Sequence, residues 1–124
     1  MAIQKILVVD DSAVERYHLT DFLSQQGYAV VEATDGEDAI AKARSHKPDL
    51  ILMDVVMPGA NGFQITRNIS RDPELESIPV IMCTAKDGET DKVWGMRQGA
   101  RGYLTKPIAH DALLAVIAQM NAAA

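Results

Sequence analysis

The 124-residue chain has one cysteine, few aromatic residues and no long apolar run. Its single cysteine, Cys83, cannot form an internal disulfide, which is typical of proteins in a reducing compartment. No apolar stretch approaches the ~20 residues of a membrane-spanning helix. The first residues lead directly into a predicted strand, so we expect no signal peptide. These features predict a cytoplasmic protein that is not associated with a membrane.

Basic residues are in the minority as well. The 12 lysines and arginines face 17 aspartates and glutamates, which gives a net charge of −5 at pH 7. Nucleic-acid binding depends on neutralising phosphates with cationic side chains, so this balance argues against a nucleic-acid partner. Long linkers, repeats and low-complexity segments are lacking too. The composition, 48% hydrophobic and 23% charged, predicts one soluble globular domain over residues 1–124.

Short apolar runs alternate five times with helix-like stretches, which predicts an α/β fold with a parallel sheet covered by helices on both faces. We predict strands at about 3–9, 28–33, 49–53, 79–83 and 102–105. We predict helices at about 12–26, 36–46, 63–70, 87–98 and 110–121. Two strand orders deserve weight. The continuously apolar first, third and fourth strands favour the doubly wound, flavodoxin-like order 2-1-3-4-5, which makes these three strands central.

The ends of the first helix carry local signals of their own. Ser12 is followed three residues later by Glu15, which predicts a capping box at the helix start. Gly27 predicts the helix end, because glycine readily adopts the left-handed conformation found there.

Four of the predicted strands end on residues suited to phosphoryl chemistry. These residues are Asp10 and Asp11, then Asp54, Thr84 and Lys106. The carboxyl ends of parallel strands form one edge, where open α/β sheets hold their ligands. Because neighbouring strands lie ~4.8 Å apart, the aspartates and the threonine come within side-chain reach, and the long lysine side chain spans the remaining gap.

Three carboxylates this close resist ionising together, so at least one pKa is expected to rise. A divalent cation and the Lys106 ammonium relieve that repulsion. Mg²⁺ prefers one or two carboxylates together with water and phosphate oxygens. We therefore predict a Mg²⁺ site at Asp10, Asp11 and Asp54. Asp54 would accept a phosphoryl group as a nucleophile, and Lys106 would stabilise the moving charge.

Other titratable and aromatic residues give weaker signals. The three histidines lack metal-ligand partners in the sequence, so we interpret His18, His46 and His110 as structural or surface residues and expect His18 to be the partly buried one. Cys83 is interpreted as a small core side chain. Trp94 lies in the polar helix 87–98, where packing onto the sheet and contact with a partner are about equally open.

In their order along the chain, these residues resemble the receiver domain of bacterial two-component response regulators. The resemblance covers the whole chain. It rests on the motifs Asp10-Asp11, Leu52-Met53-Asp54 with Met57-Pro58-Gly59 and Gly62, Thr84-Ala85, and Lys106-Pro107 with its cis-proline turn. The segment 86–101 further resembles the stand-alone receivers of twitching-motility (type IV pilus) signalling.

This resemblance implies a signalling protein that catalyses only its own phosphorylation and dephosphorylation. A histidine kinase would supply the phosphoryl group, and the carbonyl oxygen of Val56 would be a further Mg²⁺ ligand. Thr84 and Tyr103 would act as the switch residues. Their movement would change the surface of the segments 87–98, 102–105 and 110–121 and control a downstream protein in type IV pilus motility or chemotaxis-like signalling. A monomer without an output domain is expected.

Three other functions fit the residues less well. A flavodoxin-type cofactor protein needs a hydroxyl- and glycine-rich loop after the first strand, whereas Asp10-Asp11 repels phosphate. An aspartyl phosphatase typically needs a second acid two residues beyond its nucleophile, where Ser12 or Val56 stands here. A P-loop nucleotide hydrolase needs G-x-x-x-x-G-K-[ST], which the chain lacks.

Overall fold

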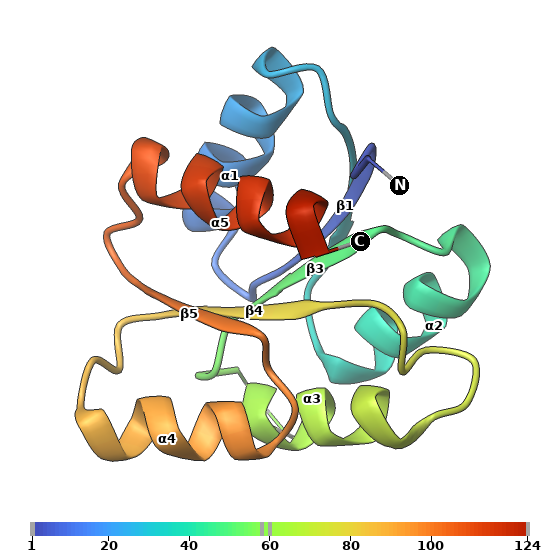
Figure 1. Cartoon of the computed structure of the whole chain (residues 1–124), viewed down its shortest axis with the longest axis vertical. Coiled ribbons are helices and arrows are strands. Elements are labelled where there is room, and N and C mark those ends of the chain that lie inside the picture. Colours follow the sequence, from blue (N-terminus) through green and yellow to red (C-terminus); the bar gives the residue numbers. More distant parts are fainter. Residues whose placement is uncertain (1, 58, 60, 124) are drawn as a thin grey trace.

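The computed structural model describes residues 2–57, 59 and 61–123. Within these residues five strands form one parallel sheet in the order β2-β1-β3-β4-β5, which confirms the predicted fold class and strand order (Figure 1). The strands are β1 (Lys5–Val9), β2 (Ala29–Ala33), β3 (Leu50–Met53), β4 (Val80–Thr84) and β5 (Gly102–Thr105). The helices are α1 (Ala13–Gln25), α2 (Gly36–His46), α3 (Gly62–Arg71), α4 (Glu89–Arg97) and α5 (His110–Ala123).

The helices cover the two faces of the sheet (Figure 1). Leu19 and Leu23 of α1 and Leu113 and Ile117 of α5 belong to one buried cluster. Residues of α2 and α3 belong to the cluster on the other face, where α4 also lies. Every residue of β3 and β4 is buried, whereas β2 and β5 are partly exposed. Burial on both faces is the reason that the central strands are continuously apolar.

The element boundaries differ from the predicted ones by a few residues. The first strand begins at Lys5, and backbone N–H groups before it bond to side chains. Ile3 donates to Asn121 (2.8 Å) and Gln4 donates to Asp49 (2.9 Å). Helix α4 begins at Glu89, and Gly88 precedes it as an N-cap without a side-chain hydrogen bond.

The predicted capping box at the start of α1 is half correct. Ser12 is the N-cap, and its hydroxyl oxygen accepts from the backbone N–H of Glu15 (3.3 Å). The reciprocal bond is missing, because the Ser12 N–H donates to Asp10 (2.9 Å) and the Glu15 carboxylate pairs with Lys106. Gly27 lies beyond the helix with φ +95°, as its role at the helix end requires.

The prediction that His18 is partly buried is wrong, because His18 is exposed. The buried positions of α1 are Leu19 and Leu23, and each residue of a helix turns the side chain by about 100°, which carries His18 away from the core. His110 stacks on Phe22 with ring centroids 3.8 Å apart. Trp94 is 49% exposed. None of the described helices is both long and apolar enough to span a membrane.

Candidate functional site

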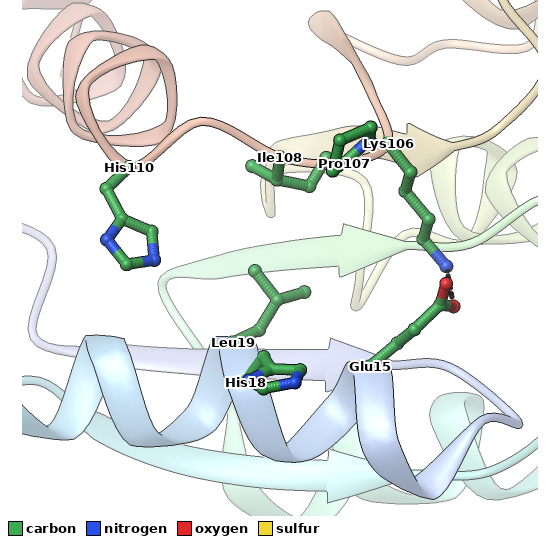
Figure 2. Close-up of a pocket in the computed structure, with 7 residues that line it drawn as sticks. All are labelled: Glu15, His18, Leu19, Lys106, Pro107, Ile108 and His110. Atoms are coloured by element: carbon green, nitrogen blue, oxygen red, sulfur yellow. Dashed lines mark hydrogen bonds and ion pairs between the residues drawn. The ribbon is translucent and has the colours of Figure 1, made fainter.

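The carboxyl edge of the sheet brings Asp10, Asp54 and Lys106 together, as the sequence predicts. The Lys106 ammonium lies 2.7 Å from Asp10 Oδ2 and 3.6 Å from Asp54 Oδ2. It also pairs with Glu15 of α1, which reaches it from the side (Figure 2). Asp10 and Asp54 are only 2% and 6% exposed, so a single cation faces two buried carboxylates.

Backbone contacts position the two buried aspartates. The N–H of Asp10 donates to Ala33 (3.1 Å) and that of Asp54 to Val9 (3.0 Å), so each residue continues the hydrogen bonding of its strand. Gly62 packs directly against the acceptor segment. A Cβ at this position would lie 2.0 Å from the Asp54 carbonyl oxygen, so only glycine fits without displacing the backbone of Asp54.

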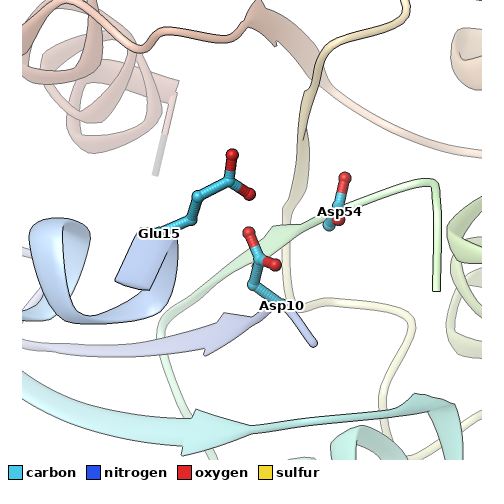
Figure 3. A group of neighbouring side chains, drawn as sticks. All are labelled: Asp10, Glu15 and Asp54. Carbon is cyan, nitrogen blue, oxygen red and sulfur yellow. The ribbon is translucent and has the colours of Figure 1, made fainter. Parts of the chain in front are cut away.

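Glu15 is the residue at this site that sequence reasoning missed. Oxygen atoms of Asp10, Glu15 and Asp54 lie within 4.8 Å of one another (Figure 3). Asp11 is exposed and does not belong to this group. The capping-box pattern predicts that the Glu15 carboxylate bonds to the backbone. The sequence signal that could have placed Glu15 at the site is its position in the first turn of a helix that begins at the carboxyl edge.

The charges at the site shift the pKa values of two groups. Burial raises the pKa of Asp54, and the Lys106 ammonium offsets this only in part, while the neighbouring Asp10 raises it further. Burial alone would lower the pKa of Lys106, but its hydrogen bonds to Asp10 and Glu15 raise that pKa above the ordinary value. Three carboxylates against one ammonium leave an excess of negative charge, which suits a divalent cation.

The remaining predicted site residues surround this cluster. Thr84 is fully buried at the end of β4, and its Oγ1 accepts from the backbone N–H of Lys86 (3.3 Å). Tyr103 is half-buried, and the Val56 side chain is 58% exposed. The Lys106–Pro107 peptide bond is cis, as the resemblance implies. Pro58 of the acceptor motif lies outside the described residues.

Burial also affects Cys83, which precedes Thr84 in β4. Its side chain is 1% exposed within the core, which confirms its interpretation as a core residue. Burial raises the pKa of the thiol to about 12, so the group is protonated at neutral pH.

Comparison with known proteins identifies the class that this fold and edge cluster define. The family model described as the response regulator receiver domain matches residues 6–118. The chain therefore belongs to the response regulator receiver domain family, which confirms the resemblance seen in the sequence.

Individual relatives agree with this assignment. Protein PilH of Pseudomonas aeruginosa is 57% identical over 113 residues, covering 91% of this chain and 93% of that protein. The phosphate regulon transcriptional regulatory protein PhoB of Escherichia coli is 40% identical over 114 residues, covering 92% of this chain and 50% of PhoB. The structure of the chemotaxis protein CheY4 of Vibrio cholerae has a TM-score of 0.89 at 34% identity, covering 96% of this chain and 99% of that one.

Proposed function

We propose that the chain is a phosphorylation switch in which Asp54 accepts a phosphoryl group from a histidine kinase. The observation that supports this proposal best is the position of the Lys106 ammonium, which approaches both Asp10 and Asp54 at the edge of the sheet. Asp54 is buried enough to be held in one place, yet it lies at the open end of β3. An acceptor in this position combines a fixed nucleophile with a cation that can hold the transferred group.

The proposed reaction is a direct transfer between donor and acceptor. A carboxylate oxygen of Asp54 forms the new bond to phosphorus while the bond from phosphorus to the donor's imidazole nitrogen breaks, and the imidazole leaves with the bonding electron pair. Lys106 stabilises negative charge on the transferred oxygens. The hydroxyl of Thr84, on the neighbouring strand, then donates a hydrogen bond to the phosphoryl group.

The donor set of the site fits Mg²⁺. The oxygens of Asp10 and Asp54 are close enough to ligate a common ion, and the excess negative charge favours a divalent one. We assign Asp11 and the carbonyl oxygen of Val56 as the further ligands that the family resemblance implies. When bound, Mg²⁺ would neutralise the carboxylates and the phosphoryl oxygens. The chain's own residues supply the nucleophile, the ammonium and the hydroxyl.

The signal would leave the site through Thr84 and Tyr103. When Thr84 turns toward the phosphoryl group, space opens beside β4 into which the Tyr103 ring can move. Helix α4 is packed closely enough to respond, because a Cβ at Gly95 would lie 3.3 Å from the Tyr103 ring. Gly95 also lowers the stability of α4 by about 1 kcal/mol relative to alanine. Phosphorylation would thus shift a pre-existing equilibrium of the surface formed by α4, β5 and α5.

The similarity to PilH supports a more specific role. We assign the chain to type IV pilus or chemotaxis-like signalling in the cytoplasm, as a monomer whose single domain passes the signal to a protein target. The α4–β5–α5 surface would contact that target. The net charge of −5 supports a protein target over nucleic acid.

Intact mass spectrometry tests the acceptor assignment. The purified protein is exposed to acetyl phosphate and Mg²⁺, and we expect the mass to rise by one phosphoryl group. Asp54→Ala should abolish this gain. Asp21→Ala removes an exposed carboxylate of α1 and should be labelled like wild type. Full labelling of Asp54→Ala at another residue would overturn the assignment.

A further inference from the structure

Helices α3 and α4 lie side by side on one face of the sheet (Figure 1). Their side chains line a polar groove. Two adjoining hollows of about 260 and 220 Å³ share Arg67, Trp94 and Gln98. Arg71 and Arg97 also line the larger hollow. None of the described residues that line either hollow is acidic, although acidic residues outnumber basic ones in the chain by 17 to 12. The groove is therefore a local concentration of positive charge.

The side chains of the three arginines of this α3–α4 groove are unpaired within the described residues. Within the part of the chain that the structure describes, no ion pair or side-chain hydrogen bond involves the guanidinium groups of Arg67, Arg71 or Arg97. Other arginines of the chain do pair, since Arg16 binds Glu32 at 3.0 Å and Arg44 binds Asp72. The groove guanidinium groups are thus free to bind an anion from outside.

Gln98 provides a second and independent observation. It ends α4 and is only 9% exposed, and its backbone carbonyl oxygen accepts from the Ser70 hydroxyl (2.9 Å) across the groove. Among the described residues, no buried side-chain nitrogen or oxygen lacks a hydrogen-bond partner, so the Gln98 amide atoms reach the solvent-accessible surface. Since Gln98 lines both hollows, its amide is available to hydrogen-bond a ligand in the groove.

Trp94 gives the groove a flat apolar surface. It is the only tryptophan of the chain, and about half of it is exposed beside the arginines. Arg71 and Arg97 lie in the last turns of α3 and α4, where cations favour the helix dipole regardless of any ligand. The dipole does not explain Arg67 in the middle of α3 or the exposed indole.

We propose that the α3–α4 groove binds a nucleotide, with its base stacked on Trp94 and its phosphate held by the arginines. Arginine presents a planar fork of donors that matches phosphate oxygens in a bidentate manner. Base–aromatic stacking adds to the affinity and accepts any base, because every base has a π-face. The two small hollows suit a small molecule better than an extended acidic peptide. This site is separate from the Asp54 cluster, so it does not depend on the phosphorylation proposed above.

Trp94 allows the proposal to be tested directly, because its fluorescence reports on the groove. The probes are AMP, GMP, ATP and GTP, with adenosine, guanosine, inorganic phosphate and a glutamate-rich peptide as comparisons. Calorimetry provides a measurement that does not depend on the indole. We expect saturable binding of at least one nucleotide, and binding of its nucleoside at least about tenfold weaker, since the phosphate contacts are charge-assisted.

Matched variants distinguish the groove from general electrostatic attraction. Arg67→Gln should weaken nucleotide binding by at least about tenfold. Arg101→Gln removes the same charge from an exposed position that lines neither hollow and should bind like wild type. Circular dichroism checks that both variants are folded. Lack of saturable nucleotide binding up to about 5 mM, equal losses in the two variants, or tighter binding of the glutamate-rich peptide would each overturn the proposal.

Discussion

The hydroxyl of Tyr103 donates a 2.6 Å hydrogen bond to the backbone carbonyl oxygen of Lys86. The N–H of the same Lys86 donates to the Thr84 hydroxyl oxygen (3.3 Å). Two hydrogen bonds therefore connect the buried end of β4 to a half-buried ring on β5. A rotation of Thr84 breaks its bond to the Lys86 N–H and alters the loop whose carbonyl oxygen holds Tyr103, so these contacts give the proposed switch a physical route.

Removing the Tyr103 hydroxyl tests this connection. Tyr103→Phe should loosen the loop after β4, because one hydrogen bond to that loop is lost while the ring remains. The loss of about 1 kcal/mol corresponds to roughly fivefold faster amide exchange at residues 86–88. Tyr17→Phe, a substitution on the exposed face of α1, is the control and should leave this exchange unchanged. Equal exchange rates in Tyr103→Phe and wild type would contradict the route.

Because the pKa of Asp54 is raised, replacing its carboxyl group by a neutral amide should stabilise the folded chain, and the gain should depend on pH. Burial raises this pKa in the folded chain, so the folded state retains the proton at pH values where the unfolded chain has released it. Wild type therefore loses stability as the pH rises through that window. Asp54→Asn avoids the loss and should be more stable at pH 7 by on the order of 1 kcal/mol, an advantage that shrinks toward pH ~4.

Urea unfolding at several pH values measures this difference. Asp21→Asn, at an exposed position of α1, is the control and should show no comparable gain. An Asp54→Asn variant that is less stable than wild type at neutral pH would show that the ion pair with Lys106 outweighs burial.

Loss of the Lys106 ammonium should have the opposite effect on stability. Lys106→Met leaves Asp10 buried without its counter-charge and should lower the free energy of unfolding by about 3 kcal/mol. The double variant Lys106→Met, Asp10→Asn should recover much of this loss. Lys86→Met changes an exposed lysine and serves as the control. Additive losses in the double variant would contradict the coupling between Lys106 and Asp10.

Calorimetric titration with Mg²⁺ tests the choice between the two nearby acidic residues. Glu15 already pairs with Lys106, whereas Asp11 is exposed and has no ion pair among the described residues. We expect Asp11→Asn to weaken Mg²⁺ binding by about tenfold and Glu15→Gln by less than about twofold. The double variant Asp11→Asn, Asp54→Asn should abolish binding. The reverse order of the two single effects would assign the third carboxylate to Glu15.

The lifetime of the phosphorylated form depends on the side chains that border the path of the attacking water. By resemblance these are Val56 and Lys86, both exposed beside the site. Neither side chain can accept a hydrogen bond and so orient a water for attack. The double variant Val56→Asn, Lys86→Glu should therefore dephosphorylate faster, as followed by loss of the phosphoryl mass. An unchanged rate of dephosphorylation in the double variant would contradict the prediction that Val56 and Lys86 make this reaction slow.

The sequence predicted the sheet and the edge cluster well because both follow from patterns along the chain. Continuous apolar runs identify the central strands, and the residue after each run lies at the shared edge, which is how Asp10, Asp54 and Lys106 were placed. The ion pair of Glu15 with Lys106 could not be predicted in this way, because Glu15 does not follow an apolar run. A glutamate in the first turn can bond the backbone or reach outward, and only the packing of the segment after β5 beside α1 decides between the two.

The α3–α4 groove shows a second limit of sequence reasoning. Arg67 and Trp94 are 27 positions apart and belong to different helices, so no local pattern predicts that they line one hollow. His18 illustrates a finer limit. A helix places neighbouring residues about 100° apart, so an error of one residue in the phase of the buried stripe moves a side chain from core to solvent.

The pairing of Lys106 with Asp10 joins residues that are 96 positions apart in the chain. During synthesis, both buried aspartates leave the ribosome long before Lys106 does. Until β5 has docked, any partly folded intermediate holds these carboxylates without their cation, a state that is costly to bury. The proposed competence to accept a phosphoryl group would therefore be acquired late, so incomplete nascent chains would not compete with the finished protein for the proposed donor kinase.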